Sequence, residues 1–236
     1  MDSKEILNKI SEWDKRIILK YNGFGGPKFT LFLKSLSFFG RETVWLLLIW
    51  YFFFIWYDPI IFSYLSTTFL VGLLIIAPVK KIFERPRPFE TLKVIKVLEP
   101  EPTSRSFPSW HAYNFVSQGL LIAYLLNSLS ITIIIIVLSL FIAFSRIQLG
   151  VHYPSDVIIG YFIGIIGFLL SIGILSVLFL RVLKFIEMLI GIEIYYRTLN
   201  IYLFENIGYL ILSISIFILI ILIASYKRIK ERVNKL

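Results

Sequence analysis

The sequence contains no cysteine and only two histidines among its 236 residues. The missing thiols exclude disulfide frameworks, thiolate metal sites and cysteine nucleophiles. Charged residues are also scarce, at 17%, whereas hydrophobic residues make up 58% of the chain. Soluble domains are about half apolar and about a quarter charged, so this composition excludes a water-soluble globule and indicates a chain folded in a lipid bilayer.

The length and the charge of the chain limit its organisation further. One helical crossing of a bilayer needs roughly 20 apolar residues, so residues 1–236 are expected to form one all-α integral membrane domain. A net charge of +9 in a soluble protein would suggest a nucleic-acid partner. Beside apolar spans it indicates membrane lipids with anionic headgroups and cytoplasmic anchoring instead, and we expect no nucleic-acid binding.

The N-terminal residues 1–21 place Ile6, Ile10 and Ile17 at helical spacing, with charged residues mostly on the other side. This pattern predicts an amphipathic helix that lies in the membrane interface and does not cross the bilayer. The next apolar stretch, residues 29–39, is expected to be shallow or partly inserted.

The rest of the chain is expected to form a bundle of about six transmembrane helices. The predicted spans are the apolar runs 43–57, 60–79, 111–126, 131–144, 157–180 and 207–224. Residues 181–205 mix apolar and charged side chains, which favours a re-entrant or interfacial segment, and residues 225–236 form a basic tail. One predicted span carries Gly160, Gly164, Gly167 and Ser171 on one face, a pattern that predicts close helix packing.

Polar residues are costly inside a membrane and usually occur where they line a site. Residues 80–156 hold both histidines and three polar clusters: Lys80 with Arg87-Pro88, then Pro108-Ser109-Trp110-His111, then Ser145-Arg146 with His152 and Asp156. The predicted helix that begins at His111 leaves one side of the membrane, and the next helix returns to that side at Ser145. We therefore expect all three clusters to face the same side.

The residue types in these clusters favour a phosphate ligand. Lys80, Arg87 and Arg146 supply three cations beside Ser109 and the histidines, with no cluster of carboxylates. Such a set suits an anion with several oxygens. Phosphoryl transfer requires mainly positioning and charge stabilisation, which these residues can provide. We expect no metal and no cofactor.

A histidine at such a site either attacks phosphorus as a neutral imidazole or protonates the leaving oxygen. Asp156 follows His152 by four residues, close enough to accept a hydrogen bond from one ring nitrogen and leave the other free to attack. Our hypothesis is that His152 is the nucleophile and Asp156 orients it. His111 has no carboxylate nearby in the sequence and is the candidate general acid.

The three clusters resemble, in order and internal spacing, the three-part signature of the type 2 phosphatidic acid phosphatase (PAP2) superfamily. The resemblance covers residues 79–160 and implies a bundle of about six helices that hydrolyses a lipid phosphate or diphosphate through a phosphohistidine, without a metal. The substrates that it leaves open are phosphatidic acid, phosphatidylglycerol phosphate, a polyprenyl diphosphate and lipid A. By position it carries over catalytic roles to His152, His111 and Asp156, and phosphate binding to Lys80, Arg87, Ser109 and Arg146.

Two places near these motifs depart from the family pattern. Trp110 stands where the commonest pattern has glycine, which bears on substrate selectivity more than on catalysis. Lys81 and Arg85 nearly duplicate the first cluster but break its spacing, and we expect them to be solvated flank or headgroup contacts.

Other functions and the orientation of the site are left open by the sequence. The same residues could transfer a phosphoryl group to another alcohol or lipid acceptor, or bind headgroups in a transporter or a non-catalytic protein. The resemblance places the site on the extracytoplasmic side, whereas a basic tail on that same side conflicts with the preference of positive termini for the cytoplasm. We expect an outward-facing site in a multi-pass cell-membrane protein that is a monomer or weak homo-oligomer.

Overall fold

A computed structural model describes residues 2–191 and 196–233 of the chain, with side chains described as far as residue 226. The described secondary structure is helical except for a two-residue antiparallel pairing of β1 (Trp56–Tyr57) with β2 (Thr198–Leu199). The predicted all-α class is therefore confirmed. Residues 192–195 of the segment predicted to be re-entrant or interfacial, and residues 234–236 of the predicted basic tail, lie outside the described residues.

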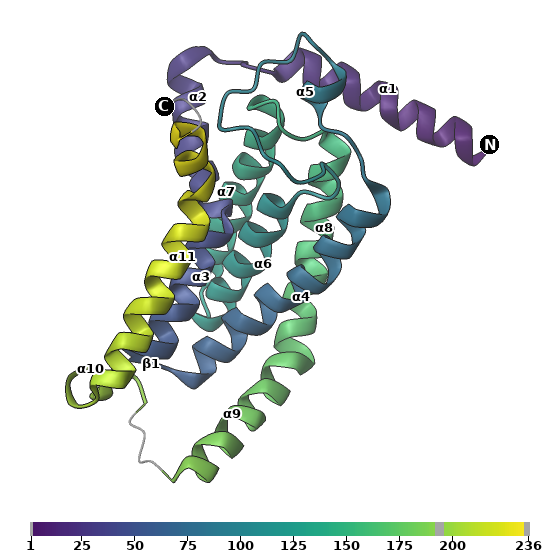
Figure 1. Ribbon diagram of the computed structural model, residues 1–236. Coiled ribbons are helices and arrows are strands. Elements are labelled where there is room, and N and C mark those ends of the chain that lie inside the picture. The colour runs from purple at the N-terminus through teal and green to yellow at the C-terminus, as the bar shows by residue number, and fades with distance from the viewer. Residues whose placement is uncertain (1, 192–195, 234–236) are drawn as a thin grey trace. The chain divides into compact units, whose positions relative to one another are not determined.

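The helices form two compact units, of which the first comprises Met1–Arg41 and Thr68–Leu170. Its elements are α1 (Ser3–Tyr21), α2 (Gly26–Ser37), η1 (Phe38–Gly40), the second part of α4 (Pro59–Phe83), α5 (Pro88–Thr91), α6 (Trp110–Leu125), α7 (Leu129–Gln148) and α8 (Pro154–Leu170). Helix α6 is the centre of this unit, because it packs against both α7 and α8, and the three lie side by side in Figure 1.

The second unit comprises Glu42–Thr67 and Ser171–Leu236. Its elements are α3 (Glu42–Trp50), η2 (Tyr51–Ile55), the β1–β2 pair, the first part of α4, η3 (Ser171–Leu175), α9 (Ser176–Ile190), α10 (Tyr202–Glu205) and α11 (Ile207–Val233). The Trp50 indole donates to the backbone oxygen of Ser213 at 3.0 Å and so joins α3 to α11. The Thr67 hydroxyl lies 2.8 Å from those of Ser171 and Ser176.

The apolar runs that were predicted to cross the membrane are helical almost throughout, and the run 43–57 ends in the short strand β1. Four segments are long and apolar enough for a crossing, namely 59–91, 129–148, 154–190 and 207–226, and a fifth is present if α2 with η1 and α3 with η2 form one bent span. The chain is therefore a multi-pass membrane protein, while the crossing number of six stays a prediction. Arg181 lies in α9, within the long helical segment 154–190, so the segment predicted to be re-entrant or interfacial begins as a helix.

The glycine face of α8 packs against α6, as its spacing predicts. A Cβ atom placed on Gly160 would lie 2.4 Å from the backbone oxygen of Ser109, and one on Gly164 would lie 2.2 Å from the Val116 side chain. These distances are shorter than real Cβ contacts, so only glycine allows the two backbones to come this close. The close approach brings the first turn of α8 next to the first turn of α6.

We predict that Gly160→Ala destabilises the protein by about 1–3 kcal/mol, the usual effect of overpacking. The measurement is thermal unfolding in detergent. Gly173→Ala is the matched control, because a Cβ atom at Gly173 meets no atom within 4 Å. An unfolding temperature for Gly160→Ala equal to that of the control would contradict the observed approach of the backbones.

Candidate active site

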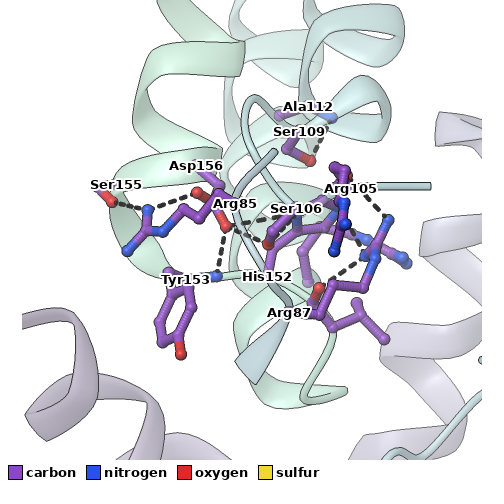
Figure 2. A network of polar contacts seen from close by, with 12 residues as sticks. Arg85, Arg87, Arg105, Ser106, Ser109, Ala112, His152, Tyr153, Ser155 and Asp156 are labelled. Atoms are coloured by element: carbon purple, nitrogen blue, oxygen red, sulfur yellow. Dashed lines mark hydrogen bonds and ion pairs between the residues drawn. The ribbon is translucent and has the colours of Figure 1, made fainter. Parts of the chain in front are cut away.

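The structure brings the three polar clusters together within the first unit. Lys80 and Arg87 lie at the end of α4 and just before α5, His111 lies in the first turn of α6, and His152 lies in the turn between α7 and α8. Ser109 is the N-cap of α6, with its hydroxyl accepting from a backbone nitrogen of the first turn at 3.5 Å. Figure 2 shows the polar network that joins these segments.

The imidazole of His152 is held by Arg87 on one side. Arg87 Nη1 lies 3.3 Å from His152 Nε2 and also donates to the backbone oxygen of Val151 at 2.7 Å. A guanidinium group can only donate hydrogen bonds, so Nε2 is the acceptor and the ring proton resides on Nδ1. This tautomer leaves an unprotonated nitrogen beside a fixed positive charge.

The other ring nitrogen faces Ser106, a residue that the sequence analysis did not select. His152 Nδ1 lies 3.7 Å from Asp156 Oδ2, so the direct hydrogen bond expected from the four-residue spacing is not formed. The Ser106 hydroxyl lies 3.4 Å from Nδ1 and donates to Asp156 Oδ2, as Figure 2 shows. Asp156 is therefore linked to the imidazole through Ser106 rather than by a direct hydrogen bond. A serine in a loop carries no periodic signal, which is why the pattern did not reveal it.

Arg85 is also part of the network, and the expectation that it is a solvated flank residue is wrong. Its Nη1 donates to Asp156 Oδ1 at 2.6 Å, and its Nη2 donates to Asp14 Oδ2 at 2.6 Å. The guanidinium also lies 4.3 Å from the ring centre of Tyr153. Lys81, in contrast, is exposed, in agreement with the prediction.

Arg146 is almost completely buried and pairs with a carboxylate from the loop between α5 and α6. Its two terminal nitrogens contact both oxygens of Glu99, and Nη1 also donates to the Ser37 hydroxyl at 2.6 Å. A carboxylate bound in this two-pronged way occupies the guanidinium face that would bind a phosphate. Glu99 and Ser37 are two further site residues that the motifs did not indicate.

Lys80 and His111 lie around the same site. Lys80 Nζ donates to the backbone oxygen of Arg105 at 2.6 Å, which ties the end of α4 to the loop before α6. His111 is half-buried against Gly40, where an added Cβ would lie 3.1 Å from the His111 side chain. The structure thus brings all the predicted phosphate-binding and catalytic residues into one region of the first unit.

Trp110, the position that departs from the family pattern, directly precedes His111. Its ring stacks on Tyr113 and meets the edge of Phe69, at centroid distances of 5.6 and 5.7 Å. The indole therefore lies between α4 and α6, beside the segment that carries the candidate general acid.

The charge state of His152 follows from its surroundings. Burial lowers the pKa of the imidazole well below its usual value, and the positive charges of Arg87, Lys80 and Arg146 lower it further. The neutral form therefore predominates at pH 7, which is the form that can act as a nucleophile. Among the residues that the structure describes, no group of three His, Cys, Asp or Glu side chains is placed to hold a metal ion.

Comparison with known proteins shows that the family model of the PAP2 superfamily matches residues 56–182. An undecaprenyl-diphosphatase from Sulfolobus acidocaldarius is 32% identical over 129 residues, which are 55% of this chain and 62% of that protein. Undecaprenyl-diphosphatase BcrC from Bacillus subtilis is 34% identical over 107 residues, which are 45% of this chain and 54% of that protein. The matches thus span less than two thirds of these relatives.

Two crystal structures resemble this fold. LpxE from Aquifex aeolicus superposes with a TM-score of 0.59 and 25% identity, over 66% of this chain and 93% of that one. A PAP2 type phosphatidylglycerolphosphate phosphatase from Bacillus subtilis superposes with a TM-score of 0.58 and 24% identity, over 70% of this chain and 86% of that one. The second likeness concerns the fold alone.

We predict that His152 stays neutral to well below pH 6.5, because its lowered pKa means that it gains a proton only when the pH falls through that lower value. The chain has only two histidines, so NMR of protein with isotope-labelled histidine gives few ring signals, and the His152→Gln variant identifies the one to follow. A His152 signal that titrates at or above pH 6.5 would contradict the charge environment described here.

Proposed function

Because this chain belongs to the PAP2 superfamily, we propose that it is a membrane phosphatase that hydrolyses a lipid phosphate or lipid diphosphate. One observation carries the proposal. A neutral imidazole, His152, presents an unprotonated nitrogen beside Arg87, while its other nitrogen is oriented through Ser106 and Asp156. This arrangement suits attack on phosphorus and has no evident use in a protein that only binds lipids.

In the proposed reaction, His152 Nε2 forms a bond to phosphorus while the bond from phosphorus to the leaving oxygen breaks. The leaving oxygen takes a proton from His111, the general acid. A water molecule then attacks phosphorus while the bond from phosphorus to His152 Nε2 breaks. The water gives up a proton to His111, and inorganic phosphate is released. The positive charge that develops on the His152 ring is balanced by the Asp156 carboxylate, relayed by Ser106.

The phosphate oxygens are bound by Lys80, Arg87, Arg146 and the Ser109 hydroxyl. The Ser109 oxygen accepts its hydrogen bond from Ala112 and keeps its own proton for a ligand. Arg146 binds phosphate by exchanging the Glu99 carboxylate for it. These residues supply positive charge on several sides of the phosphoryl group, so the proposed reaction requires no metal and no cofactor.

The substrate that we favour is a polyprenyl diphosphate. Both relatives described above are undecaprenyl-diphosphatases, at 32% and 34% identity. Trp110 supports a role in selectivity, because its ring borders the start of α6, immediately before His111, and packs between α4 and α6.

The purified protein should release phosphate in detergent from undecaprenyl diphosphate, phosphatidic acid and phosphatidylglycerol phosphate, most rapidly from the first, and should do so in excess EDTA. His152→Ala should abolish turnover on every substrate. His111→Ala should lower turnover of phosphatidic acid by about 10²–10⁴-fold. The loss should be smaller with the diphosphate, because a lipid monophosphate leaves more readily than an alkoxide.

An absolute requirement for magnesium, or turnover by His152→Ala, would contradict the proposal. Equal His111→Ala losses on all substrates would mean that His111 does not protonate the leaving group. A radiolabelled donor tests for transfer to a second lipid or alcohol: label that appears in an acceptor instead of in free phosphate would establish a phosphotransferase.

We further propose that the site faces the extracytoplasmic side. The sequence is free of cysteine, so single cysteines at Thr103, in the loop before Ser106, and at Lys235 can be labelled in intact cells with an impermeant maleimide. Thr103→Cys should react. A protected Thr103→Cys together with a reactive Lys235→Cys would place the site in the cytoplasm.

A further inference from the structure

The N-terminal helix α1 contributes a buried carboxylate to the surroundings of the catalytic residues. Asp14 is fully buried, although most of α1 is exposed. Its Oδ1 accepts from the backbone nitrogen of Ser155 at 2.9 Å, and its Oδ2 accepts from the Ser155 hydroxyl at 2.5 Å. Asp14 thus joins α1 to the first turn of α8, two helices that are far apart in the sequence.

Arg85 connects this carboxylate to Asp156. One terminal nitrogen of its guanidinium donates to Asp14 and the other to Asp156, each at 2.6 Å. Nη1 also donates to the Ser155 hydroxyl at 2.7 Å, a contact drawn in Figure 2. Both carboxylates are completely buried, whereas the Arg85 side chain is 24% exposed.

The contact between Arg85 and Asp156 matters because a buried carboxylate without a compensating charge is strongly unfavourable. Asp156 Oδ2 is occupied by the Ser106 hydroxyl and by the backbone nitrogen of Tyr153, which donates at 2.9 Å. Oδ1 is held by Arg85. Arg85 therefore supplies a positive charge in direct contact with Asp156, and it fixes the rotation of the carboxylate that faces Ser106.

We propose that Arg85 is a positioning residue, which keeps Asp156 charged and aimed at Ser106 and His152, and that Asp14 of the N-terminal helix holds Arg85 in this role. The inference rests on the proposed function. It adds to the reaction two residues that lie outside the three motifs, and the hydrogen bonds described for them go neither to His152 nor to a predicted phosphate-binding side chain. Arg85 contacts each carboxylate with a different terminal nitrogen, whereas lysine has a single nitrogen that would have to reach both, so lysine is an incomplete substitute.

The test compares Arg85→Gln, Arg85→Lys and Asp14→Asn, with undecaprenyl diphosphate as substrate. Arg85→Gln should lower kcat by about 10–100-fold, the usual effect of losing a residue that supports a functional histidine–carboxylate pair. KM should stay nearly constant, because the polar contacts of Arg85 described above go to carboxylates and Ser155 and not to the phosphate-binding side chains. Arg85→Lys should recover part of the lost kcat, and Asp14→Asn should lower kcat by about tenfold.

The double variant Asp14→Asn/Arg85→Gln shows whether the two residues affect kcat together or independently. If Asp14 acts through Arg85, Asp14→Asn should have little further effect on kcat in the Arg85→Gln background, so the two losses do not multiply. Lys81→Gln and Glu12→Gln are the matched controls, since both residues are exposed and lie close in the sequence to the residues tested. Both controls should keep wild-type kcat.

Unfolding temperatures recorded for every variant distinguish positioning from a purely structural role. Wild-type kcat in Arg85→Gln, or independent losses in the double variant, would overturn the inference, as would an effect on KM alone. If Arg85→Gln fails to fold, a wild-type kcat in Asp14→Asn still overturns it. An inactive His152→Ala beside a fully active Arg85→Gln refutes only the positioning role, whereas an active His152→Ala refutes the proposed function and this role together.

Discussion

The burial of a single negative charge, that of Asp156, constrains most of the site. A carboxylate removed from water needs hydrogen bonds and an opposite charge, and here they come from three different segments. Ser106 comes from the loop before α6, Arg85 from the segment after α4, and the Tyr153 amide from the turn before α8. Holding these partners on one carboxylate also fixes the segments that carry the candidate nucleophile and its neighbouring guanidinium.

The packing of α6 on α8 makes this concentration of charge possible. Because Gly160 lets the first turns of the two helices approach closely, the Ser109 nitrogen donates to the backbone oxygen of Asp156 at 2.9 Å. This backbone hydrogen bond ties the start of the helix that carries His111 to the start of the helix that carries Asp156. The packing of α6 on α8 therefore also determines the geometry of the site, since a shift of α8 along α6 would move the Asp156 carboxylate away from Ser106.

The sequence was sufficient to predict features that depend on periodic patterns or on the order of segments along the chain. Helical apolar runs predicted the all-α class, small residues predicted the α6–α8 contact, and the hairpin between two spans predicted that three separated clusters meet. It was not sufficient for contacts that depend on side chains brought together from distant segments. Asp14 and Arg85 are 71 residues apart, as are Arg85 and Asp156, and Ser106 lies 46 residues from His152. No local periodicity encodes such pairings, so Arg85 was wrongly expected to be a flank residue and Ser106 was overlooked.

The pairing of Arg146 with Glu99 has a consequence for product release in the proposed reaction. The Arg146 guanidinium holds an anion supplied by its own chain, at the effective concentration of an intramolecular partner. The net affinity for any phosphate at Arg146 is therefore the difference between two similar interactions rather than the full strength of one. In the proposed reaction, the Glu99 carboxylate would replace the departing phosphate at Arg146, so that no buried cation is left unpaired. This exchange would favour product release, and the inhibition constant of inorganic phosphate measures the balance.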